Sequence, residues 1–314
     1  MKKIKRYSRI IVIFIAFGLC LARAATISPM ARAAQPMVDL KTATPFAILA
    51  GTPNITDVAN SSNITGNVGL SPATGAGIGL LCSQVTGSIY SVDAAGPLPC
   101  RITNGPLMVT AKNDLTAAFI DAAGRTPITT VPTELGGTTV TAGVYASNST
   151  TFQITAGAGP LVIDAQGDPS AVFIFEMGFS GTGLTVGPGS TVSLINSASP
   201  CNIFWKVDTA SIDTTAVFKG NILALNSISV NSGANIVGRL LARNGAVTLN
   251  NDTIAIPATC AADTTSTSTT TTTPTLPNTG LAPKDKSNFL WSIIPAGIGI
   301  SLLVTYVARK KRAI

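Results

Sequence analysis

An internal repeat constrains the fold of this chain more than any other feature of its sequence. Residues 216–224 (AVFKGNILA) and residues 234–242 (ANIVGRLLA) share one pattern at an offset of 18 residues. Within each copy the apolar side chains alternate with period two, which is typical of β-strands because successive side chains point to opposite faces. A repeat of about 20 residues suits one coil of a β-solenoid, whose coils bury their apolar faces by stacking on each other. The repeat therefore predicts a β-solenoid.

The alternation also predicts which side chains of the repeat point into the solenoid. The inner row comprises Phe218, Gly220, Ile222, Ala224, Ile236, Gly238, Leu240 and Ala242, followed by Ile228, Val230, Val247 and Leu249. Leu223, Val237 and Leu241 then point outward and need a cover. The outward positions of the following strands are small and polar: Ser227, Ser229, Asn231, Thr248 and Asn250.

A helix is predicted between residues 106 and 123, where the apolar period changes to about 3.6. One face of this helix carries Met108, Ala111, Leu115, Ala118, Phe119 and Ala122. Pro106 suits the first turn, and Gly124 suits the C-terminal cap. At about 1.5 Å per residue the helix would be about 27 Å long, enough to cover about five or six coils spaced about 4.8 Å apart. We expect it to lie alongside the solenoid on Leu223, Val237 and Leu241, with a cap over one end of the stack as the alternative.

Several motifs in one order resemble the ice-binding-protein-like domain of microbes. They occupy residues 46–51 (FAILAG), 69–72 (GLSP), 121–125 (DAAGR), 164–169 (DAQGDP), 201–205 (CNIFW) and 238–243 (GRLLAR). The resemblance covers roughly residues 38–260. It implies a mostly β domain, a discontinuous right-handed β-solenoid with one long α-helix packed alongside. In characterised members of that family, a flat outer face of the solenoid binds ice.

The N-terminal segment, residues 1–34, has the layout of a secretory signal peptide. Five basic residues at positions 2–9 precede an apolar run over residues 10–21. Cleavage after Ala24 and cleavage after Ala33 both fit the preference for small residues. Lipidation at Cys20 is disfavoured because Leu19 is too large for the position before a lipidated cysteine.

The C-terminal segment predicts attachment to a cell wall. Residues 261–275 are rich in Ser and Thr and should form an extended tether, because they cannot build a core. Residues 276–314 resemble the sortase sorting signal of Gram-positive bacteria, with the motif Leu276-Pro277-Asn278-Thr279-Gly280, an apolar run over 289–308 and a basic end. Twenty apolar residues can span a bilayer. The resemblance implies that a sortase joins Thr279 to peptidoglycan, so that the protein is secreted and wall-anchored and meets the membrane only before sorting. A permanent membrane anchor is the alternative.

Charge and cysteine content narrow the possible partners. The formal charge of +7 comes from the chain ends, because residues 35–283 carry 8 basic and 13 acidic side chains, a net of −5. Nucleic acid is therefore not an expected partner. Cys82, Cys100, Cys201 and Cys260 remain after export, and an extracellular domain without histidine favours disulfides over metal. Three pairings are possible, and we favour Cys82 with Cys100 and Cys201 with Cys260, with four reduced buried thiols as the alternative. No metal and no cofactor are expected.

No catalytic residues are predicted, so an enzyme is not expected. The only close carboxylate pairs, Asp164 with Asp168 and Asp208 with Asp213, are explained by turn formation. Arg239 and Arg243 are expected to be solvated, on the outside or at a coil corner.

A binding surface is the expected kind of functional site, and the family resemblance implies that its ligand is ice. Small hydroxyl and amide groups on a rigid repeating face can hold first-shell water at low entropic cost. The predicted ice-binding face comprises Ser211, Asp213, Ser229, Asn231, Thr248 and Asn250, extended by Thr185, Thr191 and Ser193. An ordinary solvated face is the simpler interpretation of these residues. A cell-wall adhesin or structural surface protein on the same fold, without ice activity, is the alternative function.

Overall fold

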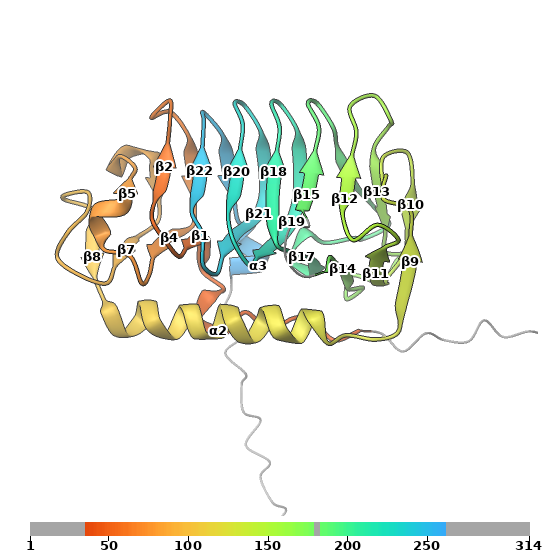
Figure 1. Ribbon diagram of the computed structural model, residues 1–314, viewed down its shortest axis with the longest axis horizontal. Coiled ribbons are helices and arrows are strands. Elements are labelled where there is room, and N and C mark those ends of the chain that lie inside the picture. The colour runs from red at the N-terminus through yellow and green to blue at the C-terminus, as the bar shows by residue number, and fades with distance from the viewer. Residues whose placement is uncertain (1–34, 179–182, 262–314) are drawn as a thin grey trace, which may run out of the picture. The chain divides into compact units, whose positions relative to one another are not determined.

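The computed structural model describes residues 35–178 and 183–261 of the chain. These residues form a mostly β domain whose strands pair in parallel in three sheets, called here sheets A, B and C (Figure 1). Successive coils stack side by side, so that each sheet runs along the domain. The expected signal peptide, the expected Ser/Thr-rich tether beyond residue 261 and the expected sorting signal with its apolar run 289–308 lie outside the described residues. Within the described residues, no helix has the length and apolar character needed to span a membrane.

Sheet A has 13 strands, and sheets B and C have seven and three. The main path of sheet A runs through β8 (Arg101–Thr103), β7 (Ile89–Ser91), β4 (Asn67–Leu70), β1 (Phe46–Ala50), β21 (Asn235–Ala242), β19 (Val217–Ala224), β17 (Ile203–Val207), β14 (Phe173–Glu176), β11 (Gly143–Ser147) and β9 (Ile128–Val131). Off this path, β23 (Thr253–Ala255) pairs with β21 and β3 (Asn63–Thr65), and β3 pairs with β6 (Val85–Thr86). Sheet B comprises β12 (Phe152–Ile154), β15 (Gly183–Val186), β18 (Thr209–Ile212), β20 (Ile228–Val230), β22 (Val247–Leu249), β2 (Ile55–Asp57) and β5 (Ile78–Gly79). Sheet C comprises β10 (Thr139–Val140), β13 (Leu161–Asp164) and β16 (Val192–Ile195).

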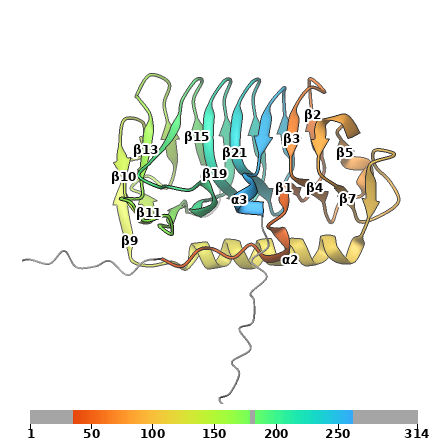
Figure 2. The same cartoon turned by 180° about the vertical axis from the view of Figure 1, so that it is seen from behind.

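The coils do not follow the order of the chain. The first coil, with β1, β2 and β3, stacks directly on the last coil, with β21, β22 and β23. Ile48 pairs with Leu240, and Ile64 pairs with Ile254, across this junction. The solenoid is therefore discontinuous, as the family resemblance implies. Its N-terminal coils extend from this junction towards one end, and the later coils reach the junction from the other end (Figures 1 and 2).

Helix α2 (Gly105–Ala123) connects the two ends by running along the stack (Figures 1 and 2). Asn104 caps its N-terminus by accepting a hydrogen bond from the Leu107 amide at 3.1 Å. All six apolar residues of the predicted face are buried. They form one apolar cluster with Leu223 and Leu241 of sheet A, so the expected packing alongside the solenoid is confirmed and a helix capping one end is wrong.

Val237, the third residue expected beneath the helix, is instead only half-buried and lies outside that cluster. The reason is a bend in β21 at Gly238, whose φ is +152°. Residues before the bend pair with β23, whereas residues after it pair with β1 beneath α2. A Cβ atom at position 238 would lie 1.9 Å from the carbonyl oxygen of Gly220, so this bend requires glycine.

The predicted inner row fills the solenoid core. Phe218, Ile222, Ile236 and Leu240 are buried there, with the inward residues of β20 and β22. Aromatic rings stack between coils, with Phe175 and Trp205 4.0 Å apart at their centroids.

Both predicted disulfides are present. Cys82 in η3 (Cys82–Gln84) is bonded to Cys100, and Cys201 in η4 (Pro200–Asn202) is bonded to Cys260 in α3 (Ala258–Ala261). The alternative of reduced thiols is therefore wrong. The remaining short helices of the described residues are η1 (Lys41–Ala43) and η2 (Gly75–Gly77).

Candidate functional site

Sheet B carries an outward row of small polar side chains that cross the strands in register. Ser211 pairs with Thr185 on one side and with Ser229 on the other. Thr248 pairs with Ser229, and Thr56 of the first coil pairs with Thr248. We call these five residues, with Gln153 at the β12 end, the central row. Neighbouring members are about 4.8 Å apart because each belongs to an adjacent strand.

The strand sequences explain why these side chains face outward. Each stands between two buried residues, which are apolar in every case except Asp57 after Thr56, as in Ile228-Ser229-Val230 and Val247-Thr248-Leu249. A slip of one residue would move the apolar side chains into water, so the alternation fixes the row on the outer face.

A second row, called the flanking row, lies at the end of the same strands. It contains Asp213, Asn231, Asn250 and Val58. The Asn231 side-chain amide donates a hydrogen bond to the Asp213 carboxylate at 3.2 Å, and the Thr214 backbone amide donates a second at 2.7 Å. The one carboxylate of the row is therefore held by neighbours. Val58 is 71% exposed and makes the flanking row apolar at the first coil.

Two residues predicted for the face lie elsewhere. Ser193 is on β16 of sheet C, where it pairs with Val162, and Thr191 forms an isolated bridge with Val217. The chain turns between sheets B and C over residues 187–191, so the period-two pattern does not continue from Thr185 to these positions. Thr191 and Ser193 instead border an open hollow of about 390 Å³ near Thr155. The structure thus brings together seven of the nine predicted residues: Thr185, Ser211, Asp213, Ser229, Asn231, Thr248 and Asn250.

Sequence reasoning missed two members of the central row, Thr56 and Gln153. Each stands between buried residues, in Ile55-Thr56-Asp57 and Phe152-Gln153-Ile154. The period-two alternation of buried and exposed side chains was therefore the signal that could have identified them. Thr56 was the harder one because its partner Thr248 is far away in the chain and becomes its neighbour only through the discontinuous coil order.

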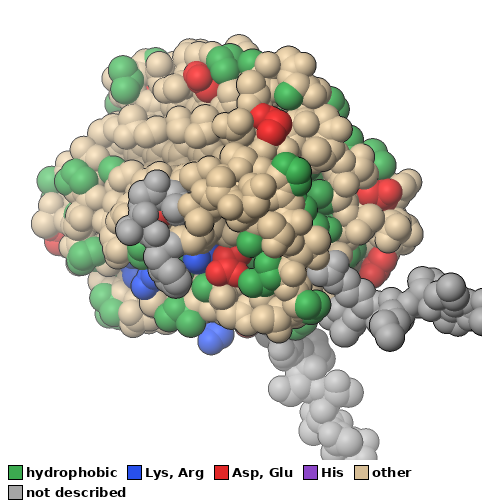
Figure 3. All heavy atoms as spheres, turned by 45° about the vertical axis from the view of Figure 1, so that its right-hand side comes forward, with side chains coloured by type: hydrophobic (Ala, Val, Ile, Leu, Met, Phe, Trp, Pro, Cys, Tyr) green, Lys and Arg blue, Asp and Glu red, His purple; other side chains and the backbone are tan. Residues whose placement is uncertain are grey.

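The face carries little charge. None of the described strands of sheet B contains Lys or Arg. At the β12 end, the Glu134 carboxylate accepts hydrogen bonds from the Gly136 and Thr155 amides at 2.6 and 3.1 Å. Burial raises the pKa of Glu134, but these bonds and that of the Thr155 hydroxyl outweigh it, so the pKa is lowered. In Figure 3, which shows the molecule from near this end, charged side chains are scattered and most of the visible surface is neither hydrophobic nor charged.

A family model described as "Ice-binding-like" matches residues 48–255. The chain belongs to this family. It is 40% identical over 225 residues to the ice-binding protein of Flavobacterium frigoris (strain PS1), covering 70% of this chain and 77% of the relative. It is 42% identical over 224 residues to an ice-binding protein of a Colwellia species, covering 70% and 84%.

Solved structures of ice-binding proteins have the same fold as this ice-binding-like domain. The crystal structure of an ice-binding protein from an Antarctic biological consortium is 35% identical with a TM-score of 0.61, covering 73% of this chain and 96% of that one. The corresponding domain of Shewanella frigidimarina ice-binding protein 1 is 27% identical with a TM-score of 0.62, covering 71% and 98%.

Asp164 and Asp168 of this ice-binding-like domain form turn contacts, as predicted. Asp213 accepts a hydrogen bond from the adjacent Thr214 amide, whereas Asp208 accepts one from the distant Asn226 side chain at 2.5 Å. Asp164 accepts a hydrogen bond from the Gln166 amide at 2.7 Å, and Asp168 accepts one from the Ser170 amide at 2.8 Å. The bonds from Ser170 lower the pKa of Asp168.

The expectation that both arginines are solvated is wrong. Arg239 is only 2% exposed and donates to the Thr44 carbonyl and the Asn221 side chain, both at 2.8 Å. Burial lowers its pKa to about 10. Arg243 is half-buried against helix α2. Arg239 keeps the outward position that the alternation predicts, but it is buried because the segment at Thr44 and helix α3 at Cys260 cover it and accept its hydrogen bonds.

Proposed function

We propose that this protein binds ice through the outer face of sheet B. One observation carries the proposal: the central row of hydroxyl and amide side chains crosses adjacent parallel strands in unbroken register. Membership of the ice-binding-like family, whose relatives are named as ice-binding proteins, supports it.

The chemistry of this face fits a surface that presents only ordered water. Short hydroxyl side chains lose little conformational entropy when they anchor water, and interfacial waters bond nearly as well as direct partners. The strands hold them at a repeat of about 4.8 Å on a backbone that is packed on its inner side. The lack of Lys and Arg on these strands avoids long mobile charged side chains that would disturb a water layer.

We further propose that the solenoid is right-handed, and that the protein is secreted and joined by a sortase to peptidoglycan through Thr279. The family resemblance supports the handedness. The order of segments in the sequence supports secretion and wall attachment: basic and apolar N-terminus, domain, Ser/Thr-rich tether, Leu276–Gly280 motif, apolar run and basic end. Helix α3, where the described domain ends, lies on the side away from sheet B (Figures 1 and 2). A wall attached there would leave sheet B facing outward, which favours a role in holding the cell to ice or limiting ice growth at its surface.

The test is a single bulky substitution on the central row. Thr248→Tyr should leave the fold intact because the side chain points outward, but its ring should interrupt the face and abolish both ice-crystal shaping and thermal hysteresis. Thr139→Tyr is the matched control, because Thr139 is exposed on β10 of sheet C. Circular dichroism should be unchanged in both. If the folded wild-type domain neither shapes ice nor shows hysteresis, the wall adhesin without ice activity replaces this proposal.

A further inference from the structure

The structure assigns a mechanical role to the Cys201–Cys260 disulfide. We infer that it diverts a pull on the C-terminal tether away from the last strands of the chain, β21 to β23, and onto the start of β17. This inference rests on the proposed wall attachment, because that attachment makes the C-terminal end the point where force enters the domain.

Cys260 lies in α3, where the described part of the domain ends. Its disulfide partner Cys201 lies in η4, directly before β17. Strand β17 is internal to sheet A, with β14 on one side and β19 on the other. The end of the domain is therefore covalently joined to the middle of a sheet, although the last strand before it, β23, pairs with β21 and β3.

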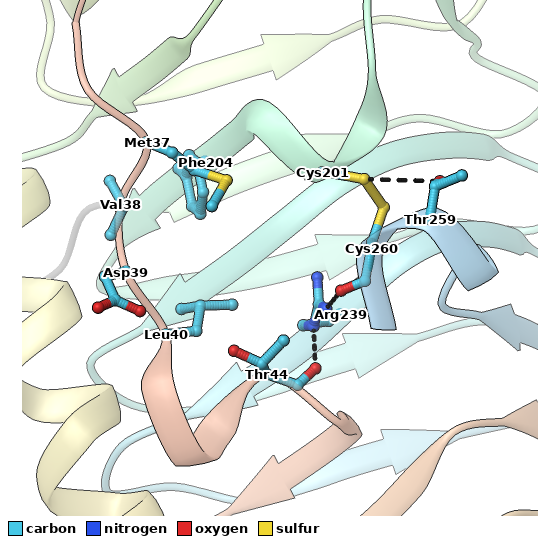
Figure 4. Close-up of a pocket in the computed structure, with 10 residues that line it drawn as sticks. All are labelled: Met37, Val38, Asp39, Leu40, Thr44, Cys201, Phe204, Arg239, Thr259 and Cys260. Atoms are coloured by element: carbon cyan, nitrogen blue, oxygen red, sulfur yellow. Dashed lines mark hydrogen bonds between the residues drawn. A yellow bond between two sulfur atoms is a disulfide. The ribbon is translucent and has the colours of Figure 1, made fainter. Parts of the chain in front are cut away.

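A buried polar network joins the same two cysteines a second time. Asn221 on β19 donates from its side-chain amide to the Cys201 carbonyl at 3.1 Å. Its side-chain oxygen accepts a hydrogen bond at 2.8 Å from Arg239, which lies opposite it on β21. Arg239 also donates to the carbonyls of Cys260 and, in the first coil, Thr44. Figure 4 shows Arg239 between Thr44 and Cys260, beside the disulfide.

The consequence for a pull on the tether follows from chain connectivity. Without the disulfide, tension at Cys260 would detach β23, β22 and β21 in turn, and each step would break only the contacts of one strand. With the disulfide, the 59-residue separation between the cysteines is bridged, and the residues between them cannot be drawn out. At about 3.5 Å per residue, roughly 200 Å of chain is withheld from extension.

The protected segment contains the centre of the candidate ice-binding face. Ser211, Ser229 and Thr248 all lie between Cys201 and Cys260. Loss of β21 and β22 would also uncover the first coil, which stacks on them. The disulfide therefore keeps the strands of this face in place while force is applied at the C-terminal tether.

Optical-tweezers measurements on the isolated domain test this inference without ice or cell wall. One handle is coupled to an unnatural side chain at position 56 on sheet B, and the other to a tail after residue 261. In the wild type we expect no extension from residues 202–259 at any force. In the Cys201→Ser/Cys260→Ser variant we expect early, stepwise extension at lower force, adding up to about 200 Å.

The Cys82→Ser/Cys100→Ser variant is the matched control, because it loses the other disulfide and should keep the first unfolding event of the wild type. If the Cys201/Cys260 variant does not fold, wild-type protein that is folded first and then reduced on the instrument replaces it. If loss of the Cys201–Cys260 bond changes neither the first unfolding event nor the force at which it occurs, the inference is overturned. The bond would then stabilise the fold without directing the applied force. Failure of ice binding or wall attachment would not alter this measurement.

Discussion

Arg243, at the corner after β21, lies over the ring of Phe119 on helix α2, with Cζ 4.8 Å from the ring centroid. Lys206 approaches the same ring with Nζ 5.3 Å from the centroid. Cations over an aromatic face are attracted by the ring quadrupole. Lys112 of α2 adds hydrogen bonds to the carbonyls of Ala242 and Arg243 at 2.7 and 2.6 Å. Helix α2 is thus held to sheet A by polar contacts at the margin of its apolar interface.

The apolar part of that interface gives the first prediction. Leu241→Asp should lower the free energy of unfolding by more than about 3 kcal/mol, because it buries a carboxylate without a partner beneath the helix. Val237→Asp, on the same strand but half-exposed beyond the bend at Gly238, should cost less than about 1 kcal/mol. Urea unfolding monitored by circular dichroism measures both. Equal losses in the two variants would contradict the packing of α2 on Leu241.

The second prediction concerns pH and the junction between the first and last coils. Burial, aided by the charge of Asp57, raises the pKa of Asp252 from 3.8 to about 6. The folded protein therefore holds a proton on Asp252 that the unfolded chain releases near pH 4. The contribution of Asp252 to the free energy of unfolding is full below pH 4 and is lost as the pH rises to 6. We expect a loss of about 1 to 3 kcal/mol over that window.

Asp252→Asn should flatten the dependence of the unfolding free energy on pH between pH 4 and 6. Asp57 does not contribute in that window. Burial raises its pKa, but hydrogen bonds from Ser62, Asn251 and Gln84 outweigh this and lower it, so its stabilisation is lost only at more acidic pH. Unfolding curves at several pH values test the slope, which is independent of any constant cost of the substitution. An unchanged slope would show that Asp252 is ionised normally in the folded domain.

The third prediction is a gain of ice activity. Ser211 and Ser229 are the two serines between the threonines of the central row. Ser211→Thr/Ser229→Thr should strengthen adsorption, because two added methyl groups bury apolar area against the ice surface and contribute about 1 kcal/mol, roughly fivefold in the adsorption equilibrium. Thermal hysteresis at matched concentration is the measurement. Ser193→Thr on sheet C is the control, and a similar gain there would argue against sheet B as the ice-binding face.

The fourth prediction concerns wall attachment. A wall-degrading enzyme should release the domain from intact cells with Thr279 still bearing a wall fragment, whereas detergent alone should not. Mass spectrometry of the released C-terminal peptide distinguishes the two states. Extraction by detergent with residues 281–314 still attached would favour the permanent membrane anchor.

The sequence allowed the solenoid and the helix interface to be predicted because both depend on local periodicity. The alternation in residues 216–249 placed Ser229 and Thr248 on the outer face, and the 3.6-residue period placed Leu115 and Phe119 on the buried side of α2. These patterns reflect burial, which acts on each residue according to its own neighbours in the strand or helix.

Corners and distant neighbours could not be predicted in the same way. Val237 was misplaced because the bend at Gly238 separates it from the part of β21 that lies beneath α2. Arg239 was misplaced because Thr44 and Cys260, which are distant in the chain, cover it. Thr191 and Ser193 were misplaced because the chain changes sheet before them. Thr56 was missed because it becomes a neighbour of Thr248 only when the first coil stacks on the last coil. The stacking order depends on contacts across the whole domain, and the local sequence around Thr56 does not reveal it.

The stacking of β1 on β21 has a consequence for how the chain reaches its native state. Most solenoids can grow coil by coil, because each repeat touches only its sequence neighbours. Here the first coil stacks on the second coil on one side, but its other side stays uncovered until the last coil has emerged. A nascent chain that lacks residues 235–255 therefore cannot complete even its N-terminal part. Such distant contacts slow folding. A chain whose first coil is covered on both sides only after residues 235–255 are present stays incompletely folded until then, which suits the passage across a membrane that the proposed secretion requires.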